Sequence, residues 1–512
     1  MTAQPLRSRR NHWMNQVAIH AEMRPDAVAF RCRGTDTTWR QLHDRSERLA
    51  AALFRRGIGF GDRVLIVMLN HTEYVESVLA INALGAIAVP VNFRLTDPEI
   101  RYIVSDSGAK GVITDQLLAP LIDAVRRNTT GLEVAVVLGD DYESLISEPG
   151  EPHPGADVPE DTPALIMYTS GTTGSPKGAI LSHSNLQAQS LTCIQALQTS
   201  PDSVYFCAAP MFHIAGLGSI APNLVLGTKT VIHPLGAFNA AETLDAWERE
   251  RATSVFLVPA QWQLICADPT VRQRDLALEV ISWGAAPASD TVLRAMAETF
   301  PDALNVAVFG QTEMSPITCV LDGKDAIRKL GSVGKVIPTI AARVVDENMN
   351  DVAPGEIGEI VYRGPTLMQG YWNKPEATAE AFAGEWFHSG DLVRVDDEGF
   401  VYVVDRKKDM IISGGENIYC AEVENALFEH AQIREAAVIG RADDKWGEVP
   451  VAVVAVVAEA AGDAPLTLRD LEPFLNERLA RYKHPKELVL VDELPRNASG
   501  KVVKHQLRKT YG

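Results

Sequence analysis

Cysteine is scarce in this chain, and the spacing that would give it a special role is missing. Six cysteines are present: Cys32, Cys193, Cys207, Cys266, Cys319 and Cys420. No two of them stand in C-x-x-C spacing, so neither a zinc site nor a disulfide framework is expected. The six thiols are interpreted as reduced thiols of a cytoplasmic protein.

Long hydrophobic runs are also missing. The longest, such as Val451 to Val457, fall far short of the roughly 20 residues that cross a bilayer, and no apolar stretch opens the chain. We expect no transmembrane segment. Arg7, Arg9 and Arg10 leave peripheral contact with the inner face of a membrane open, although three charges near a terminus are more often simply solvated.

Positive charge is in short supply. The chain has 48 Lys and Arg against 66 Asp and Glu, which gives a formal net charge of −18. An acidic surface repels phosphates, so we expect no nucleic-acid partner. Apolar residues make up 46% and charged residues 22%, close to ordinary globular proteins.

A chain of 512 residues is longer than a single hydrophobic core usually accommodates, which predicts at least two domains. From Thr37 to Asn92 a helical pattern with Leu42, Leu49 and Leu53 on one side is followed by apolar runs at 63–69 and 86–90 around a helix at 72–84. This alternation indicates a mainly parallel sheet layered with helices. The stretch from 336 to 404 has short strands and Gly or Asp turns, which predicts a β-rich portion.

The pattern changes after the charged segment Asp405–Asp409. Helices are expected near 421–430 and at 468–479, and strands at 436–440, 449–457 and 487–491. These elements predict a small α+β domain of about 100 residues. The fold class is therefore α/β, with a large N-terminal domain and a small C-terminal one.

The strongest local signal is the glycine-rich segment from Tyr168 to Gly178, which follows an apolar strand. Its glycines permit tight turns whose amides can approach phosphate oxygens, and its hydroxyls and Lys177 add donors. The segment lacks the G-x-x-x-x-G-K-[ST] spacing of P-loop NTPases. Such a loop is also typical of a plain flexible connection.

Further motifs follow in order: residues 283–287 (WGAAP), 309–313 (FGQTE), 386–391 (WFHSGD), 405–417 (DRKKDMIISGGEN) and 495–501 (PRNASGK). With the segment from 168 to 178 they resemble the adenylate-forming superfamily of acyl-CoA synthetases, peptide-synthetase adenylation domains and luciferases. The resemblance spans nearly the whole chain. Residues 406–419 and 482–501 look closest to mycobacterial FadD-type fatty-acid–CoA ligases.

The resemblance implies a nucleotide site for ATP and AMP. Its residues would be Thr169, Ser170, Gly171, Thr172, Thr173, Gly174, Lys177, Gly284, Ala285, Ala286, Phe309, Gly310, Gln311, Thr312, Asp391, Arg406 and Lys501. Asp391 would bind both ribose hydroxyls, with Arg406 assisting, because an ionised carboxylate accepts two strong hydrogen bonds. Phe309 stands where the family often has Tyr, so it would keep the stacking on adenine and lose a phenolic hydrogen bond; plain core packing is its other interpretation.

Catalytic roles follow from the same resemblance for Lys501, Glu313 and His213. Lys501 would bridge the carboxylate and the α-phosphate, which otherwise repel each other. Glu313 and Thr172 would hold Mg²⁺ through oxygen ligands. The acyl group would lie near His213, Gly216 and Gly284, although a histidine in an apolar run is often a core residue.

Thiol attack has to follow the departure of pyrophosphate, and the family achieves this by rotating its small domain. By resemblance, residues 1–405 form the ATP- and acid-binding domain, 406–409 the hinge with Lys408 as pivot, and 410–512 the mobile domain. Ser413, Gly414 and Gly415 would then line the CoA path. An ordinary tight turn is the alternative for the two glycines.

The sequence thus predicts an ATP-dependent fatty-acid–CoA ligase that uses ATP, Mg²⁺ and CoA. Two alternatives stay open: a fatty-acyl-AMP ligase that loads a carrier protein, and a ligase for aryl or steroid-side-chain acids. A catalytically silent nucleotide-binding protein is disfavoured because the charged motif residues are all retained. Relatives in the family are often homodimers, and the sequence leaves the oligomeric state open.

Overall fold

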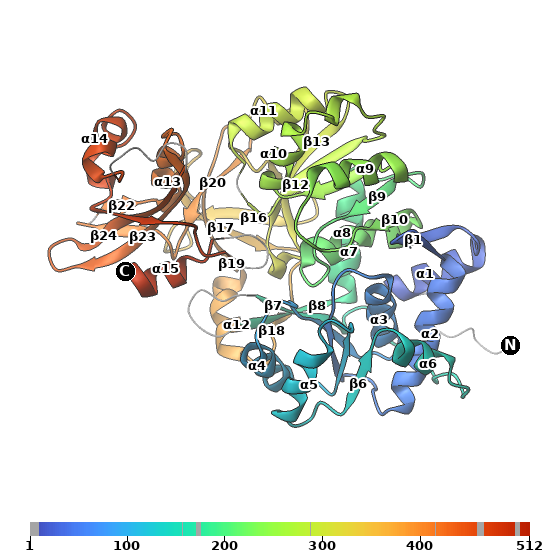
Figure 1. Cartoon of the computed structure of the whole chain (residues 1–512). Helices are drawn as coiled ribbons and strands as arrows, with labels where there is room; N and C mark the ends of the chain where they lie inside the picture. Colours follow the sequence, from blue (N-terminus) through green and yellow to red (C-terminus); the bar gives the residue numbers. More distant parts are fainter. Residues whose placement is uncertain are drawn as a thin grey trace. The chain divides into compact units, whose positions relative to one another are not determined.

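The computed structural model describes residues 10–155, 157–169, 176–286, 288–414, 416–457, 465–496 and 502–512. The chain divides into two compact units. The first comprises residues 1–341 and 363–387, and the second comprises residues 342–362 and 388–512. Figure 1 shows the elements of each unit along the chain.

The first sheet of the first unit has the strand order β15-β14-β13-β12-β11-β9-β10-β1-β2. Its strands are β1 (Val28–Cys32), β2 (Thr35–Thr38), β9 (Val204–Cys207), β10 (Lys229–Ile232), β11 (Ser254–Leu257), β12 (Val280–Gly284), β13 (Leu304–Gly310), β14 (Ile317–Leu321) and β15 (Lys335–Val336). The strands from β13 to β1 are parallel, and antiparallel neighbours complete both edges.

The second sheet of this unit has the order β18-β8-β7-β4-β3-β5-β6. Its strands are β3 (Arg63–Val67), β4 (Ile87–Pro90), β5 (Gly111–Thr114), β6 (Val134–Val137), β7 (Pro163–Thr169), β8 (Lys177–Ser182) and β18 (Gly370–Tyr371). Leu65, Val89 and Val112 are fully buried here, and each such side chain contributes roughly 1.5–3 kcal/mol to folding. Burial on both faces explains why these strands read as continuous apolar runs.

Helices cover both sheets (Figure 1). They are α1 (Trp13–Met23), α2 (Trp39–Arg55), α3 (Thr72–Ala83), α4 (Asp97–Ser107), α5 (Ala119–Arg127), α6 (Asp140–Ser147), α7 (His183–Ala196), α8 (Ile214–Leu226), α9 (Ala240–Glu250), α10 (Pro259–Ala267), α11 (Asp290–Thr299) and α12 (Pro375–Ala381). The sequence of α2 shows why a helix forms there. Thr38 and Gln41 form a reciprocal capping box at its start, and Leu42 and Leu49 face the core.

The second unit contains two sheets. One has the order β16-β17-β19-β20, and the other runs β22-β21-β24-β23 with β25 parallel to β24. Its elements are β16 (Ala341–Val345), β17 (Gly358–Arg363), β19 (Phe387–Val395), β20 (Val401–Arg406), β21 (Ile411–Ser413), β22 (Glu416–Ile418), α13 (Cys420–Phe428), β23 (Ile433–Asp443), β24 (Gly447–Val456), α14 (Leu468–Asn476), β25 (Glu487–Val491) and α15 (Lys504–Tyr511).

Alternating side chains divide the second of these sheets into two apolar faces. Val438 and Val454 pack with Leu471 of α14, whereas Ile439 and Val453 pack with Leu507 of α15. In Figure 1, α13 and α14 lie on one side of β23 and β24 and α15 lies on the other. A strand that is apolar at every position is thus explained by burial on both faces.

The predicted α/β class with a large and a smaller part is confirmed. The helix at 72–84 and the strands at 63–69 and 86–90 are present, and β3 and β4 are parallel as expected. The β-rich stretch within 342–362 and 388–406 groups with the C-terminal residues, and a hinge at 406–409 stays a prediction. In the part of the chain that is described, each helix is too short or too polar to cross a membrane.

Candidate active site

Two neighbouring parallel strands of the first sheet end in predicted nucleotide-binding segments. β12 ends at Gly284, which Ala285 and Ala286 follow, and β13 carries Phe309 and Gly310 at its end. Their parallel register places these ends side by side. Ligands of parallel α/β sheets bind beyond the carboxyl ends of the strands. The structure therefore brings the residues expected around adenine to one sheet edge.

The backbone at this edge leaves no room for side chains at the two glycines. A Cβ on Gly284 would overlap the carbonyl oxygen of Val308, and one on Gly310 would overlap that of Pro316. Ala285 has φ of 63°, a left-handed conformation that is costly for alanine. Strained residues of this kind cluster at ligand sites, which supports a binding role for the turn after β12.

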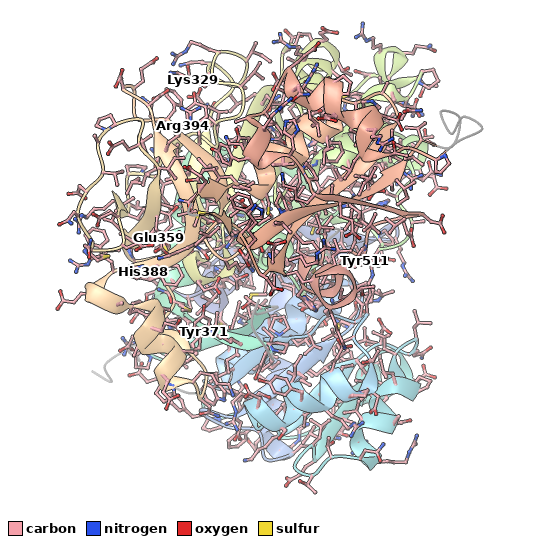
Figure 2. All side chains as sticks on the ribbon, turned by 90° about the vertical axis from the view of Figure 1, so that its left-hand side faces the viewer. Lys329, Glu359, Tyr371, His388, Arg394 and Tyr511 are labelled. Atoms are coloured by element: carbon pink, nitrogen blue, oxygen red, sulfur yellow. The ribbon has the colours of Figure 1, made fainter. Side chains whose placement is uncertain are left out.

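Glu313 lies just beyond β13 and is buried, with 9% of its surface exposed. The hydroxyl of Tyr371, which is labelled in Figure 2, donates to Oε1 of Glu313 at 3.0 Å. Burial raises the pKa of Tyr371, and the charge of Glu313 raises it further, so the phenol stays a donor. Gln311 and Thr312 precede Glu313, and the amide of Gln311 donates to the carbonyl of Pro316 at 2.8 Å.

The donor set fits a magnesium ion that arrives with a nucleotide. Among the residues that the structure describes, no group of three or more His, Cys, Asp or Glu could hold a metal ion alone. Glu313 offers one carboxylate, and Mg²⁺ is commonly held by one or two carboxylates together with phosphate oxygens. Thr172, the other predicted ligand, lies outside the described residues.

The predicted phosphate segment joins β7 to β8. Thr169 ends β7, Lys177 begins β8, and the two are cross-strand partners. The ammonium group of Lys177 lies 5.1 Å from the ring centroid of Tyr371, a cation–π distance. Ser170, Gly171, Thr172, Thr173 and Gly174 lie outside the described residues.

His213 is the N-cap of α8 and is half-buried. Its Nδ1 accepts from the amide of Ala215 at 3.2 Å, so this histidine is more than core filling. A Cβ on Gly216 would overlap the carbonyl oxygen of Pro210, which makes glycine obligatory in the first turn of the helix.

Asn70 holds the segment before His213 and was missed by the sequence analysis. Its side-chain amide donates to the carbonyl of Ala209 at 2.9 Å and accepts from the amide of Met211 at 2.9 Å. Asn70 is 1% exposed and follows the end of β3. A polar residue directly after a buried parallel strand was the available signal.

In the second unit, Asp391 and Arg406 face each other across β19 and β20. The guanidinium Nε lies 2.7 Å from Oδ1 of Asp391, whose side chain is 2% exposed. The predicted pair is thus assembled by strand register. Close by in the same sheet, Glu359 accepts from His388 at 3.0 Å, and Figure 2 shows the two side chains together.

The remaining predicted residues lie beyond β20. Lys408 is exposed in a turn. Ser413 is the last residue of β21. Gly414 has a φ of 60°, and a Cβ added to it would lie only 2.7 Å from the ring of Trp446, so glycine is required there. Gly415 and Lys501 lie outside the described residues.

Comparison with known proteins gives two family matches. The AMP-binding enzyme family matches residues 17–372, and the AMP-binding enzyme C-terminal domain matches residues 422–501.

Relatives of several substrate classes align along almost the whole chain. An indoleacetate–CoA ligase of Aromatoleum aromaticum is 39% identical over 509 residues, covering 98% of this chain and 97% of that protein. A long-chain-fatty-acid–CoA ligase of Mycobacterium tuberculosis is 34% identical over 509 residues, covering 98% of each. The structure of o-succinylbenzoate–CoA synthetase from Bacillus subtilis, in complex with its acyl-adenylate intermediate, has a TM-score of 0.87 at 30% identity and covers 96% of this chain and 98% of that one.

Proposed function

Because the chain belongs to the AMP-binding enzyme family, we propose that it activates a carboxylic acid with ATP and transfers the acyl group to CoA. In the first half-reaction a carboxylate oxygen bonds to the α-phosphorus and pyrophosphate leaves. In the second, the CoA sulfur bonds to the acyl carbon, AMP leaves, and the thiol proton is released. Membership confirms the superfamily that the motifs predicted, with FadD-type relatives included.

The observation that supports adenylation best is that Lys177 and Glu313 both contact the side chain of Tyr371. The lysine ammonium lies over the phenol ring at 5.1 Å, and the carboxylate accepts from its hydroxyl at 3.0 Å. A cation for phosphate and an oxygen ligand for Mg²⁺ are therefore one side chain apart. Mg²⁺ bound there would neutralise phosphate charge.

The other roles are proposed from the motifs. Asp391, oriented by Arg406, would accept from the ribose hydroxyls, and Phe309 would stack on adenine. His213 would face the acid carboxylate, and Lys501 would offset the repulsion between the carboxylate and the α-phosphate. After pyrophosphate leaves, residues 410–512 would rotate at the 406–409 hinge. This rotation would bring Ser413, Gly414 and Gly415 to the thiol of CoA.

The acid is proposed to be aromatic or arylalkyl. The support is the indoleacetate–CoA ligase, which is 39% identical, against 34% for the long-chain-fatty-acid–CoA ligase. A fatty acid, the class that the motifs predicted, is the second candidate. Both classes use the same adenylation chemistry, so the choice rests on the acid pocket alone.

The test is acid-dependent AMP formation by the purified protein, with arylacetic acids, hydroxycinnamic acids and fatty acids of graded length, each with and without CoA. We expect AMP and acyl-CoA to rise together with one acid class. AMP formation that is the same with and without CoA would indicate that the acyl acceptor is a carrier protein. Absence of acid-dependent pyrophosphate exchange with every acid would contradict the proposed function.

A further inference from the structure

Asp106 stands in the last turn of α4 and belongs to none of the sequence motifs of the site. Helix α4 begins at a Thr96–Glu99 capping box and ends at Gly108, whose φ of 62° closes it. Tyr102 and Asp106 are four residues apart, so their side chains share one face of the helix. That face meets the β7–β8 hairpin.

Two hydrogen bonds connect this face to both ends of the phosphate segment. The hydroxyl of Tyr168, the residue before Thr169, donates to Oδ2 of Asp106 at 2.8 Å. The hydroxyl of Tyr102 donates to the carbonyl of Pro176, the residue before Lys177, at 3.0 Å and lies 3.4 Å from Oδ1 of Asp106. One helix therefore contacts Tyr168 and Pro176, the residues on either side of positions 169–175.

A cation completes the cluster. Lys374 lies 2.6 Å from Oδ1 of Asp106, whose side chain is only 6% exposed, and Asn373 donates to the Asp106 carbonyl at 3.2 Å. The hydrogen bond with Asp106 raises the pKa of Lys374. Burial, and then the bond to Asp106, raise the pKa of Tyr168. At neutral pH the carboxylate is thus held by one protonated phenol and one ammonium group.

The hairpin has backbone pairing of its own besides these contacts. The ladder between β7 and β8 already pairs Thr169 with Lys177 and Tyr168 with Gly178. The ring of Tyr168 also packs where Gly178 has no side chain, which limits the positions that its hydroxyl can take. The cluster therefore constrains the ends of the segment beyond what the sheet supplies.

We propose that Asp106 is a positioning residue for ATP: it holds Tyr168, while Tyr102 on the same face of α4 holds Pro176, and together they set the spacing of the ends of the phosphate segment. Asp106 touches no substrate. The proposal rests on the proposed function, because the segment is taken to bind ATP phosphates. A charge-assisted hydrogen bond of this kind is worth roughly tenfold or more in an equilibrium constant.

The test compares Asp106→Asn, Tyr168→Phe and the double variant. Each single change keeps the side-chain shape and removes the carboxylate charge or the phenol hydroxyl. We expect the Kd of MgATP, measured by calorimetry without acid, and the KM for ATP to rise roughly tenfold, while the KM for the acid changes less than twofold. Because both changes act on the shared contact between Tyr168 and Asp106, the double variant should raise the Kd of MgATP little more than Asp106→Asn alone, which also weakens the ion pair with Lys374.

The matched control is Tyr142→Phe. The hydroxyl of Tyr142 donates to the buried carboxylate of Glu76 at 2.7 Å, a similar pair elsewhere in the same unit. The Tyr142→Phe change should lower the melting temperature of the protein and leave the Kd of MgATP unchanged. Equal rises in the KM values for ATP and acid, or an unchanged Kd for MgATP in Tyr168→Phe, would overturn the proposal. The ATP titration needs no acid, so a wrong acid class or a failed ligase assay would not be mistaken for its failure.

Discussion

At the scale of single residues, the motifs select the groups that carry charge, and the fold supplies the groups that orient them. Glu313 stands within a motif, whereas Tyr371, which donates to its carboxylate, lies far along the chain. Asn70 relates to the His213 segment in the same way. Sequence reasoning selected Glu313 and His213 from the motifs and missed Tyr371 and Asn70, because these two lie outside the motifs and are identified by their contacts in the folded chain.

Lys501→Ala tests the proposed catalytic lysine. Loss of a preorganised cation should slow adenylation by roughly 10²-fold or more. Acid-dependent pyrophosphate exchange measures this step directly. Lys509→Ala, an exposed lysine of α15, is the control and should exchange normally. Near-normal exchange in the Lys501 variant would remove the lysine from the mechanism.

The burial of His183 predicts how the free energy of unfolding depends on pH. Burial lowers the pKa of His183 to about 3, and the neighbouring ring of His12 adds to the shift. Unfolded histidine titrates near pH 6.5, so this site favours the folded state above about pH 6.5 and loses that contribution as the pH falls toward 3.

The expected slope for this one site is about 1.4 kcal/mol per pH unit between those limits. Urea unfolding of the wild type and of His183→Leu at pH 7, 6 and 5 measures it. The variant should lose stability less steeply on acidification. Parallel losses in the two proteins would mean that His183 is not the group that titrates.

At the scale of elements, strand ends and turns decide where the site lies. Most strands and helices were predictable from periodicity, and the boundaries of β25 agree with the expected 487–491. The β-rich stretch was also predicted as such. Its grouping with the C-terminal residues was not, because it depends on pairing between strands far apart in the chain.

Lys408→Pro tests the proposed hinge. Proline fixes φ near −65° and restricts the backbone rotation that a pivot requires, whereas Lys408→Ala keeps that freedom. We expect Lys408→Pro to impair thioester formation from a preformed adenylate more than pyrophosphate exchange, and Lys408→Ala to impair neither strongly. An equal loss in both half-reactions would argue against a pivot here.

At the scale of the whole molecule, the second unit contains a half-buried cluster of charged side chains. Lys504 lies 2.7 Å from Glu424, with side chains 16% and 18% exposed, and Arg508 lies 2.6 Å from Asp409. Burial alone would lower the pKa of Lys504, but the carboxylates around it outweigh burial and raise its pKa. α15 is thereby joined to α13 and to the end of the predicted hinge.

Lys504→Ala should destabilise this unit by up to about 3–5 kcal/mol, because it leaves the carboxylate of Glu424, only 18% exposed, without its ion-pair partner. Two compact units need not unfold together, so the loss should appear mainly in one of them. Hydrogen exchange of peptides from 388–512 and from 10–341 measures each separately. Lys509→Ala is again the control, and equal acceleration in both units would contradict a local effect.

Local patterns in the chain were sufficient for the α/β class, and the resemblance of its motifs was sufficient for the superfamily. The site roles of Glu313, His213, Asp391 and Arg406 stay predictions. Periodicity and motif spacing are properties of neighbouring residues, so they survive without coordinates. Only the folded chain decided that Tyr371 orients Glu313 and that Asp106 and Tyr102 of α4 contact the two ends of the phosphate segment. Such contacts join residues from separate strands and helices, and they form only when the sheets bring distant parts of the chain together.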